Sequence, residues 1–322
     1  MSVPPAKRSI GLLGPQRLTP TLSAAVTALG IEGSLAVVTA GWQEREDDTR
    51  ELVEHLAGRA VNLELHRRAE RVFERDPELA RAHHERQELF RRMHELYRFR
   101  LEAAKRVARA LFARAENGPA LASERGDSIE AIRRLDERHL GQQRAIHAEF
   151  EARWRPFERE AVRTEREEIR GVLEKSAGLG IAGGHVAVLV NRLRLFGIVE
   201  LLGTKPVVAW SAGAMVCAES IVLFHDFPPQ GTGSTEVLDV GLGLAPGIQP
   251  FPHAKRRLDL SDPVRIQMLA LRFAPASCVA LEDGAHLLRR GRDARWHGDA
   301  GCTRFAQDGA IVPLSTVEGA LA

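Results

Sequence analysis

The chain has 322 residues, of which 44% are hydrophobic and 27% charged, so there is material for a sizeable core and room for two folding units. A formal net charge of +2 gives no reason to expect a nucleic acid or a membrane as partner. Cys217, Cys278 and Cys302 are odd in number and lack metal-ligand spacing, which suits a reducing compartment. No apolar stretch follows Lys7 and Arg8 as in a secretory signal, and none is long enough to span a bilayer. We therefore expect a cytoplasmic protein.

Strands and helices alternate at the start of the chain. Apolar, β-branched runs predict strands at residues 9–14, 34–40 and 60–65, with helices at 21–29 and 48–56 between them. This alternation predicts an α/β fold with a doubly wound, mostly parallel sheet. Gln43 and Glu44 follow the second strand, at the sheet edge where ligands collect, although an ordinary solvated loop is the simpler interpretation.

From about residue 66 to residue 175, strand signals give way to Arg and Glu. Two sets of mostly apolar residues recur every three or four positions, as on one face of a helix. The first is Leu89, Met93, Leu96, Arg100 (through its stem), Ala104, Val107 and Leu111, and the second is Ile129, Ile132, Leu135, His139, Ile146, Phe150, Trp154 and Phe157. They predict two long helices that form an antiparallel hairpin, with a turn at 117–119 and Asp127-Ser128 as the N-cap of the second helix.

The role of this helical insertion stays open at the sequence level. Its apolar stripes need cover from the partner helix, the rest of the chain or a second copy, so both a homodimer and a lid over the active site are reasonable. Interleaved Glu opposes nucleic-acid binding. The histidines of the two helices have no acidic or cysteine partners at ligand spacing, so we interpret them as surface or seam residues rather than metal ligands. They are His83, His84, His94, His139 and His147.

The most informative segment is residues 207–214, VVAWSAGA. A short buried strand runs directly into a helix, and Ser211 occupies the corner. Such a strand–turn–helix is the nucleophile elbow, usually G-x-S-x-G; here Ala209 replaces the first glycine and Gly213 keeps the second. An incidental serine in an ordinary turn is the alternative interpretation.

Two further side chains complete a possible triad in the order serine, acid, histidine. Asp226 precedes a Pro-Pro pair, and His253 follows two prolines that favour an extended loop. A histidine can take the serine proton near neutral pH, and a carboxylate can orient the imidazole. The residues that compete for these roles are Asp239, Glu219 and His225.

These segments resemble the peptidase E and cyanophycinase group of serine peptidases. The resemblance rests on WSAGAM at 210–215, on His225-Asp226 and on Pro252-His253, and it covers roughly residues 8–65 and 178–315. It implies a class I glutamine-amidotransferase-like fold, with Ser211 as nucleophile, Asp226 as acid and His253 as base. It also implies that no metal or organic cofactor takes part.

The resemblance extends upstream and downstream of the elbow. Residues 181–194 are similar to a family segment in which glycine N–H groups help to form the oxyanion hole, here Gly184 with Ala212. Gly183 and His185 then lie on the substrate side, where His185 replaces the frequent asparagine of the family. Residues 279–285 are similar to a late strand and turn. The amidotransferases of this fold use cysteine at the elbow, so serine argues against glutaminase activity, and Cys217 is interpreted as a packed residue.

The sequence thus predicts an α/β catalytic domain from residues 1–65 and 178–322, interrupted by a helical hairpin at 66–177. We expect a serine peptidase acting on small peptides, with aspartyl peptides as the first candidates from the family. Arg256 could bind a substrate carboxylate, or lie in a solvated basic turn. A non-peptidase acyl hydrolase and a catalytically idle scaffold that acts through the hairpin are the alternatives, and a homodimer through the hairpin is possible.

Overall fold

The computed structural model describes residues 8–116, 118–227, 235–291, 293, 295–299 and 301–318. Its strands are β1 (Ile10–Leu13), β2 (Leu35–Val38), β3 (Ala60–Asn62), β4 (Gly178–Ile181), β5 (Val207–Trp210), β6 (Ser220–Leu223), β7 (Glu236–Val240), β8 (Ile248–Pro252), β9 (Ser277–Leu281), β10 (His286–Arg289), β11 (Arg295–Gly298), β12 (Cys302–Phe305), β13 (Ile311–Pro313) and β14 (Thr316–Glu318). Its α-helices are α1 (Leu22–Ala28), α2 (Arg50–His55), α3 (Leu65–Arg75), α4 (Pro77–Phe112), α5 (Pro119–Trp154), α6 (Glu160–Lys175), α7 (Val186–Leu195), α8 (Ile198–Leu201), α9 (Ala212–Cys217), α10 (Ala254–Arg257) and α11 (Pro263–Phe273), with 3-10 helices η2 (Ala40–Arg45) and η3 (Pro156–Glu158). Within these ranges no helix is long and apolar enough to cross a membrane.

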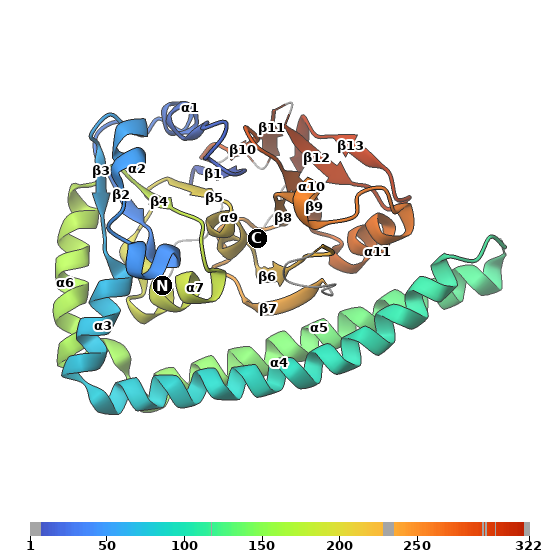
Figure 1. Ribbon diagram of the computed structural model, residues 1–322, viewed down its shortest axis with the longest axis horizontal. Helices are drawn as coiled ribbons and strands as arrows, with labels where there is room; N and C mark the ends of the chain where they lie inside the picture. Colours follow the sequence, from blue (N-terminus) through green and yellow to red (C-terminus); the bar gives the residue numbers. More distant parts are fainter. Residues whose placement is uncertain are drawn as a thin grey trace.

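The largest sheet has eight strands in the order β14-β11-β10-β1-β5-β4-β2-β3 (Figure 1). From β1 to β3 all neighbours are parallel, whereas β10, β11 and β14 extend the other edge in antiparallel fashion. The predicted α/β fold with a mostly parallel sheet is confirmed, and all five N-terminal elements form where the sequence pattern placed them.

Both faces of the sheet are buried. Alternate residues of the central strands point to opposite sides, so Leu12 and Val38 join one apolar cluster while Leu13 and Val37 join the other. The smaller cluster is completed by α1 and α2, and the larger one by α7, α9 and the helical insertion. Strands covered on both faces read as continuous apolar runs, which explains why residues 207–210 gave so clear a signal.

A second sheet, β13-β12-β9-β8, lies beside the first, and β6 pairs with β7 as a separate ribbon. In the second sheet β8 and β9 are parallel, with Pro252 opposite Leu281. The loops that follow these two strands carry His253 and Glu282.

The stretch between β3 and β4 is a set of four α-helices rather than the two of the predicted hairpin. Helices α4 and α5 are the long antiparallel pair at the bottom of Figure 1, and α3 and α6 lie beside each other at its left. The predicted N-cap at Asp127-Ser128 is wrong. Helix α5 already begins at Pro119, because proline suits the first helical position, and the Ser128 hydroxyl donates to the Arg125 carbonyl instead. Asn117 of the predicted turn lies outside the described residues, and the division into two domains stays a prediction.

The apolar stripe predicted on the second helix is covered, but the stripe on the first helix faces solvent. Leu89, Leu96 and Val107 are 44%, 71% and 59% exposed. Helix α4 instead buries the face that contains Tyr97 and Leu101. The sequence pattern identified the helix correctly. Within this chain the predicted stripe is not the buried face, and its cover by a second copy stays a prediction.

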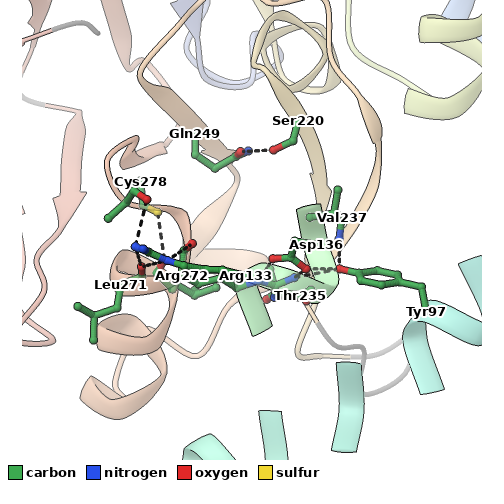
Figure 2. Close-up of polar contacts among 12 residues, drawn as sticks. Tyr97, Arg133, Asp136, Ser220, Thr235, Val237, Gln249, Leu271, Arg272 and Cys278 are labelled. Carbon is green, nitrogen blue, oxygen red and sulfur yellow. Dashed lines mark hydrogen bonds and ion pairs between the residues drawn. The ribbon is translucent and has the colours of Figure 1, made fainter. Parts of the chain in front are cut away.

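A buried polar network explains which face of α4 turns inward (Figure 2). The Tyr97 hydroxyl donates to Asp136 Oδ1 at 2.6 Å, and Arg272 of α11 binds the same carboxylate through Nε at 2.7 Å and a terminal nitrogen at 2.8 Å. Arg272 also donates to the Thr235 carbonyl at 2.8 Å, and the Val237 N–H donates to the Tyr97 hydroxyl at 3.1 Å. This network joins α4, α5, α11 and β7 around one carboxylate.

The histidines of the insertion are mostly seam residues, as expected. His139 stacks on Tyr97 with ring centroids 4.1 Å apart, and His147 binds Asp239 at 3.2 Å. Burial, with smaller contributions from nearby cations, lowers the pKa of His83 to about 3 and that of His139 to about 4, so both are neutral at pH 7.

Candidate active site

Ser211 occupies a strained corner between β5 and α9. Its φ and ψ are 53° and −123°, a combination that non-glycine residues rarely adopt, and it directly precedes the first residue of α9. A Cβ at Gly213 would lie 2.1 Å from the Ile181 carbonyl oxygen, so only glycine lets β4 and α9 approach this closely. The small residues around the serine are therefore required by the packing of a sharp strand-to-helix turn.

The pair Gly183-Gly184 lies against this corner. A Cβ on Gly183 would be 2.9 Å from Ser211 Cβ, 3.2 Å from its Oγ and 3.4 Å from the Ala212 nitrogen. Gly184 has a φ of +109°, and a Cβ there would clash with the Gly41 carbonyl oxygen at 2.3 Å. The two glycines thus bring one backbone segment into contact with both the serine side chain and the first N–H of α9.

The oxyanion hole that the sequence predicted from Gly184 and Ala212 stays a prediction, and two observations bear on its donors. The first N–H groups of a helix have no intrahelical partner, which applies to Ala212. The backbone hydrogen bonds that the described residues make in loops and turns do not use the Gly184 N–H. Neither N–H group is thus engaged in these backbone hydrogen bonds, which is what donors to an anionic oxygen require.

His185 and Gln43 flank the glycine pair. His185 is the N-cap of α7, and its Nδ1 accepts the Val188 N–H at 3.3 Å. The backbone N–H of His185 donates to the Gly41 carbonyl at 2.7 Å. Gln43 has φ and ψ of 57° and −123°, nearly the same strained conformation as Ser211. Two strained residues thus follow the carboxyl ends of β2 and β5.

Three backbone contacts link the strand ends that carry Ser211 and His253. The Ser211 N–H donates to the Leu13 carbonyl at 3.2 Å, and the next residue, Gly14, packs so tightly that a Cβ would lie 1.8 Å from the Glu282 carbonyl oxygen. The His253 N–H in turn donates to the carbonyl of Leu281 at 3.1 Å. Serine and histidine therefore follow strand ends that are packed together, although they belong to different sheets.

Burial lowers the pKa of His253 below its usual value, with Arg257 as the next cause. Asp283 acts in the opposite direction and Arg256 adds to the lowering. The imidazole is therefore neutral at pH 7, as a general base must be. Arg256 is exposed on α10 and near enough to act on His253 electrostatically.

Asp226 makes other contacts. Its Oδ2 accepts the Asp259 N–H at 2.8 Å, Oδ1 binds Arg265 of α11, and its N–H donates to the Arg257 carbonyl at 2.6 Å. Among the described residues, no hydrogen bond or ion pair joins Asp226 to His253. Its role as the orienting acid stays a prediction.

Two acids that the sequence analysis left without a role lie beside His253. Glu282 follows β9 and accepts the Lys255 N–H at 2.9 Å, at the start of the short helix that His253 precedes; burial raises its pKa. Asp283 is the acid whose charge acts on His253. The available signal was the position of both acids directly after a buried strand, which in an α/β fold is where site residues gather.

Of the three competing candidates, Asp239 is engaged elsewhere, since it binds His147 and Arg194. Glu219 is exposed, and His225 is partly buried; neither makes a side-chain hydrogen bond or ion pair among the described residues. Cys217 is fully buried, and burial raises the pKa of its thiol to about 12, so it is the packed residue that was expected. Within the described ranges, no cluster of three or more His, Cys, Asp or Glu side chains could hold a metal ion.

Comparisons with known proteins give distant structural similarity. No protein-family model and no curated protein matches the chain. A solved structure of a peptidase from an acI-B1 Actinobacterium is similar over 97% of both chains, with 11% identity and a TM-score of 0.45. A candidate peptidase E from Listeria monocytogenes EGD-e is similar over 41% of this chain and 64% of its own, with 15% identity and a TM-score of 0.29. The chain is similar to solved structures of peptidases. At these identities and TM-scores the assignment of a function depends on the site.

Proposed function

We propose that this protein is a serine hydrolase of the peptidase type, with a class I glutamine-amidotransferase-like fold. The observation that carries the proposal is the backbone of Ser211, held at φ 53° between a buried strand and a helix N-terminus with Gly183 against its side chain. Such strain costs on the order of 1–3 kcal/mol and persists where it serves a site.

In the proposed reaction, His253 takes the proton of the Ser211 hydroxyl as Oγ attacks the scissile carbonyl carbon. The Ala212 and Gly184 N–H groups hold the resulting oxyanion, and His253 then returns the proton to the leaving amine. Water, deprotonated by the same imidazole, then attacks the acyl-enzyme carbonyl, and His253 returns that proton to Ser211 Oγ as the carboxylic acid product leaves. No step needs a metal or an organic cofactor.

Asp283 is a second candidate for the orienting role beside Asp226, because its charge raises the pKa of His253 whereas the Asp226 carboxylate is bound by Arg265. Small peptides with an acidic residue are the proposed substrates. Arg256 supports this choice, since an exposed guanidinium near His253 is suited to bind a carboxylate.

Labelling with a fluorophosphonate probe, followed by intact-mass measurement, tests the proposal. We expect one adduct on the wild-type protein, none on Ser211→Ala and none on His253→Ala. If the folded wild-type protein fails to react while a control hydrolase is labelled, the triad is idle and the scaffold alternative is favoured. A labelled protein that cleaves acyl esters but no peptide is a non-peptidase hydrolase.

A further inference from the structure

A cavity of about 270 Å³ lies between the helical insertion and α11, apart from the candidate active site. Its wall combines α4, α5, α11 and the residue before β7. The lining side chains are Glu102, Lys105, Arg106, Arg109, Ile132, Thr235, Arg265, Met268, Leu269 and Arg272. Five of these carry a positive charge and one a negative charge. We call this the basic cavity.

Three of the five cations are bound to acids outside the cavity. Arg272 binds Asp136, Arg265 binds Asp226, and Arg109 binds Asp262 at 2.6 Å. These ion pairs hold the guanidinium groups in place and compensate much of their charge.

Lys105 and Arg106 make no hydrogen bond or ion pair among the described residues, and only Glu102 opposes them in the wall of the cavity. Arg106 is exposed to solvent, but Lys105 is only partly accessible. A lysine placed this way loses hydration without gaining a counter-ion.

The electrostatics of Lys105 reflect the lack of a counter-ion. Burial, together with the charges of Arg272 and Arg265, lowers its pKa to about 7, against smaller opposing effects of Asp226 and Glu236. An anion in the cavity would reverse this, because it would favour the charged ammonium.

The remaining wall is apolar. Ile132 is buried, and Met268 and Leu269 complete that side. A ligand that satisfies both walls has an anionic group and a small apolar body, and the volume suits a ligand of modest size.

We propose that the basic cavity binds a small organic anion, whose carboxylate or phosphate is held by Lys105 and Arg265 and whose apolar part lies against Met268 and Leu269. Because α4 and α11 both line the cavity, a bound ligand would contact the insertion and the rest of the chain at once. None of the residues proposed for catalysis lines the cavity, so this inference is independent of the proposed hydrolase activity.

Isothermal titration calorimetry of the full-length protein with benzoate, phenyl phosphate and benzamide tests whether the basic cavity binds anions. Benzamide has nearly the shape of benzoate without the charge, and phenyl phosphate distinguishes a phosphate-preferring site from a carboxylate-preferring one. We expect at least one of the two anions to bind about tenfold or more tightly than benzamide, and inorganic phosphate to bind more weakly than phenyl phosphate.

Variants assign the binding to the cavity. Lys105→Met should lower anion affinity about tenfold or more, Lys105→Arg should restore part of it, and Arg91→Met, a change at an exposed cation of the same helix, should leave it unchanged. Wild-type binding at pH 8 should take up protons, as measured in buffers of different ionisation enthalpy, and Lys105→Met should abolish this uptake. The charged groups that line the cavity with Lys105 or act on it electrostatically are Glu102, Arg106, Arg109, Asp226, Glu236, Arg265 and Arg272.

Three results would overturn the inference: equal binding of benzoate, phenyl phosphate and benzamide, no binding of either anion, or full affinity in the folded Lys105→Met variant. The wild-type comparison stands even if a variant fails to fold. Fluorophosphonate labelling of the same samples reports separately on the hydrolase proposal.

Discussion

At the scale of single residues, the space around Ser211 leaves no room for a side chain on Gly183. A Cβ there would lie 2.9 Å from the serine Cβ and 3.2 Å from its Oγ, and the serine Cβ cannot move without a change in the strained turn. Gly183 is therefore expected to matter both for the position of the nucleophile and for the stability of this turn.

Replacing Gly183 with Ala should lower the rate of fluorophosphonate labelling by about two orders of magnitude. The added methyl group would press on Ser211 and lie 3.4 Å from the Ala212 nitrogen, and displacing one oxyanion-hole donor costs about 10²–10³ in rate. The thermal midpoint should fall as well, because the serine turn must shift to admit a methyl group 2.9 Å from Ser211 Cβ, so labelling is compared at a temperature where the variant is folded. Gly171→Ala on α6 is the matched control, because nothing lies within 4 Å of the added methyl group and labelling should be unchanged. A Gly183→Ala protein that labels at the wild-type rate would show that the glycine pair has no part in the site.

The charges around His253 predict opposite shifts of the pH profile in two variants. Asp283 raises and Arg256 lowers the pKa of this imidazole, so Asp283→Asn should move the acid limb of kcat/KM to lower pH and Arg256→Met should move it to higher pH. The wild-type limb should lie below the ordinary histidine value, because burial already lowers this pKa. The rate of fluorophosphonate labelling, measured at intervals between about pH 4 and pH 8, gives the midpoint of the acid limb for each protein.

Asp226→Asn tests the acid that the sequence predicted. We expect the acid limb to stay in place, since the Asp226 carboxylate is bound by Arg265 and the Asp259 N–H. A fall of about 10⁴ in kcat, as for the orienting acid of a serine protease, would instead restore Asp226 to the triad.

Residues with a local reason for their identity were predictable. Ser211, Gly183 and Gly184 are constrained by neighbours a few residues away or by backbone packing that only small residues allow, and such constraints leave a visible motif. The partner of His253 has no local signature. It depends on how β8 and β9 come together, and several acids in the sequence satisfied the same chain order.

At the scale of secondary-structure elements, α4 carries apolar residues on two faces. The exposed face repeats at alternating spacings of four and three residues through Leu89, Met93, Leu96, Arg100, Ala103 and Val107, and Phe99 beside it is 78% exposed. This is the spacing of a coiled-coil seam, which pairs with another helix of the same kind. The second face was hidden in the sequence because both stripes have the same period.

This exposed stripe should mediate the homodimer that the sequence suggested. We expect sedimentation velocity to show a concentration-dependent dimer, and Leu96→Glu with Phe99→Glu to convert it to a monomer without unfolding it. Glu95→Gln, on a neighbouring exposed face, should leave the dimer intact. A wild-type protein that stays monomeric at high concentration would contradict this arrangement.

Asp136 should be a large contributor to stability among the charged residues of the insertion. Replacing it with Ala leaves Arg272 buried without its counter-ion, for which we expect a loss of about 3–5 kcal/mol in the free energy of unfolding. Urea denaturation measures this, and Glu137→Ala, an exposed neighbour on α5, should stay within about 0.5 kcal/mol of the wild type. Equal stability of both variants would mean that the network contributes little.

At the scale of the whole molecule, the seam between the insertion and the rest of the chain should make stability fall in mild acid. His83 and His139 are buried, with pKa values lowered to about 3 and about 4, whereas both titrate near 6.5 in the unfolded chain. Below pH 6.5 the unfolded state therefore binds protons that the folded state cannot, so acid favours unfolding. The loss continues until the pH falls through each folded-state pKa.

The free energy of unfolding should accordingly fall between pH 7 and pH 5 by about 2 kcal/mol for each of the two histidines. Urea denaturation at the two pH values measures the fall, and His83→Gln should reduce it by about 2 kcal/mol, whatever the effect of the substitution on stability at pH 7. His84→Gln changes the exposed neighbour on the same helix and should leave the difference between the two pH values unchanged. A His83→Gln variant that keeps the full wild-type difference would show that His83 is protonated in the folded protein, and hence that this part of the seam is open to water.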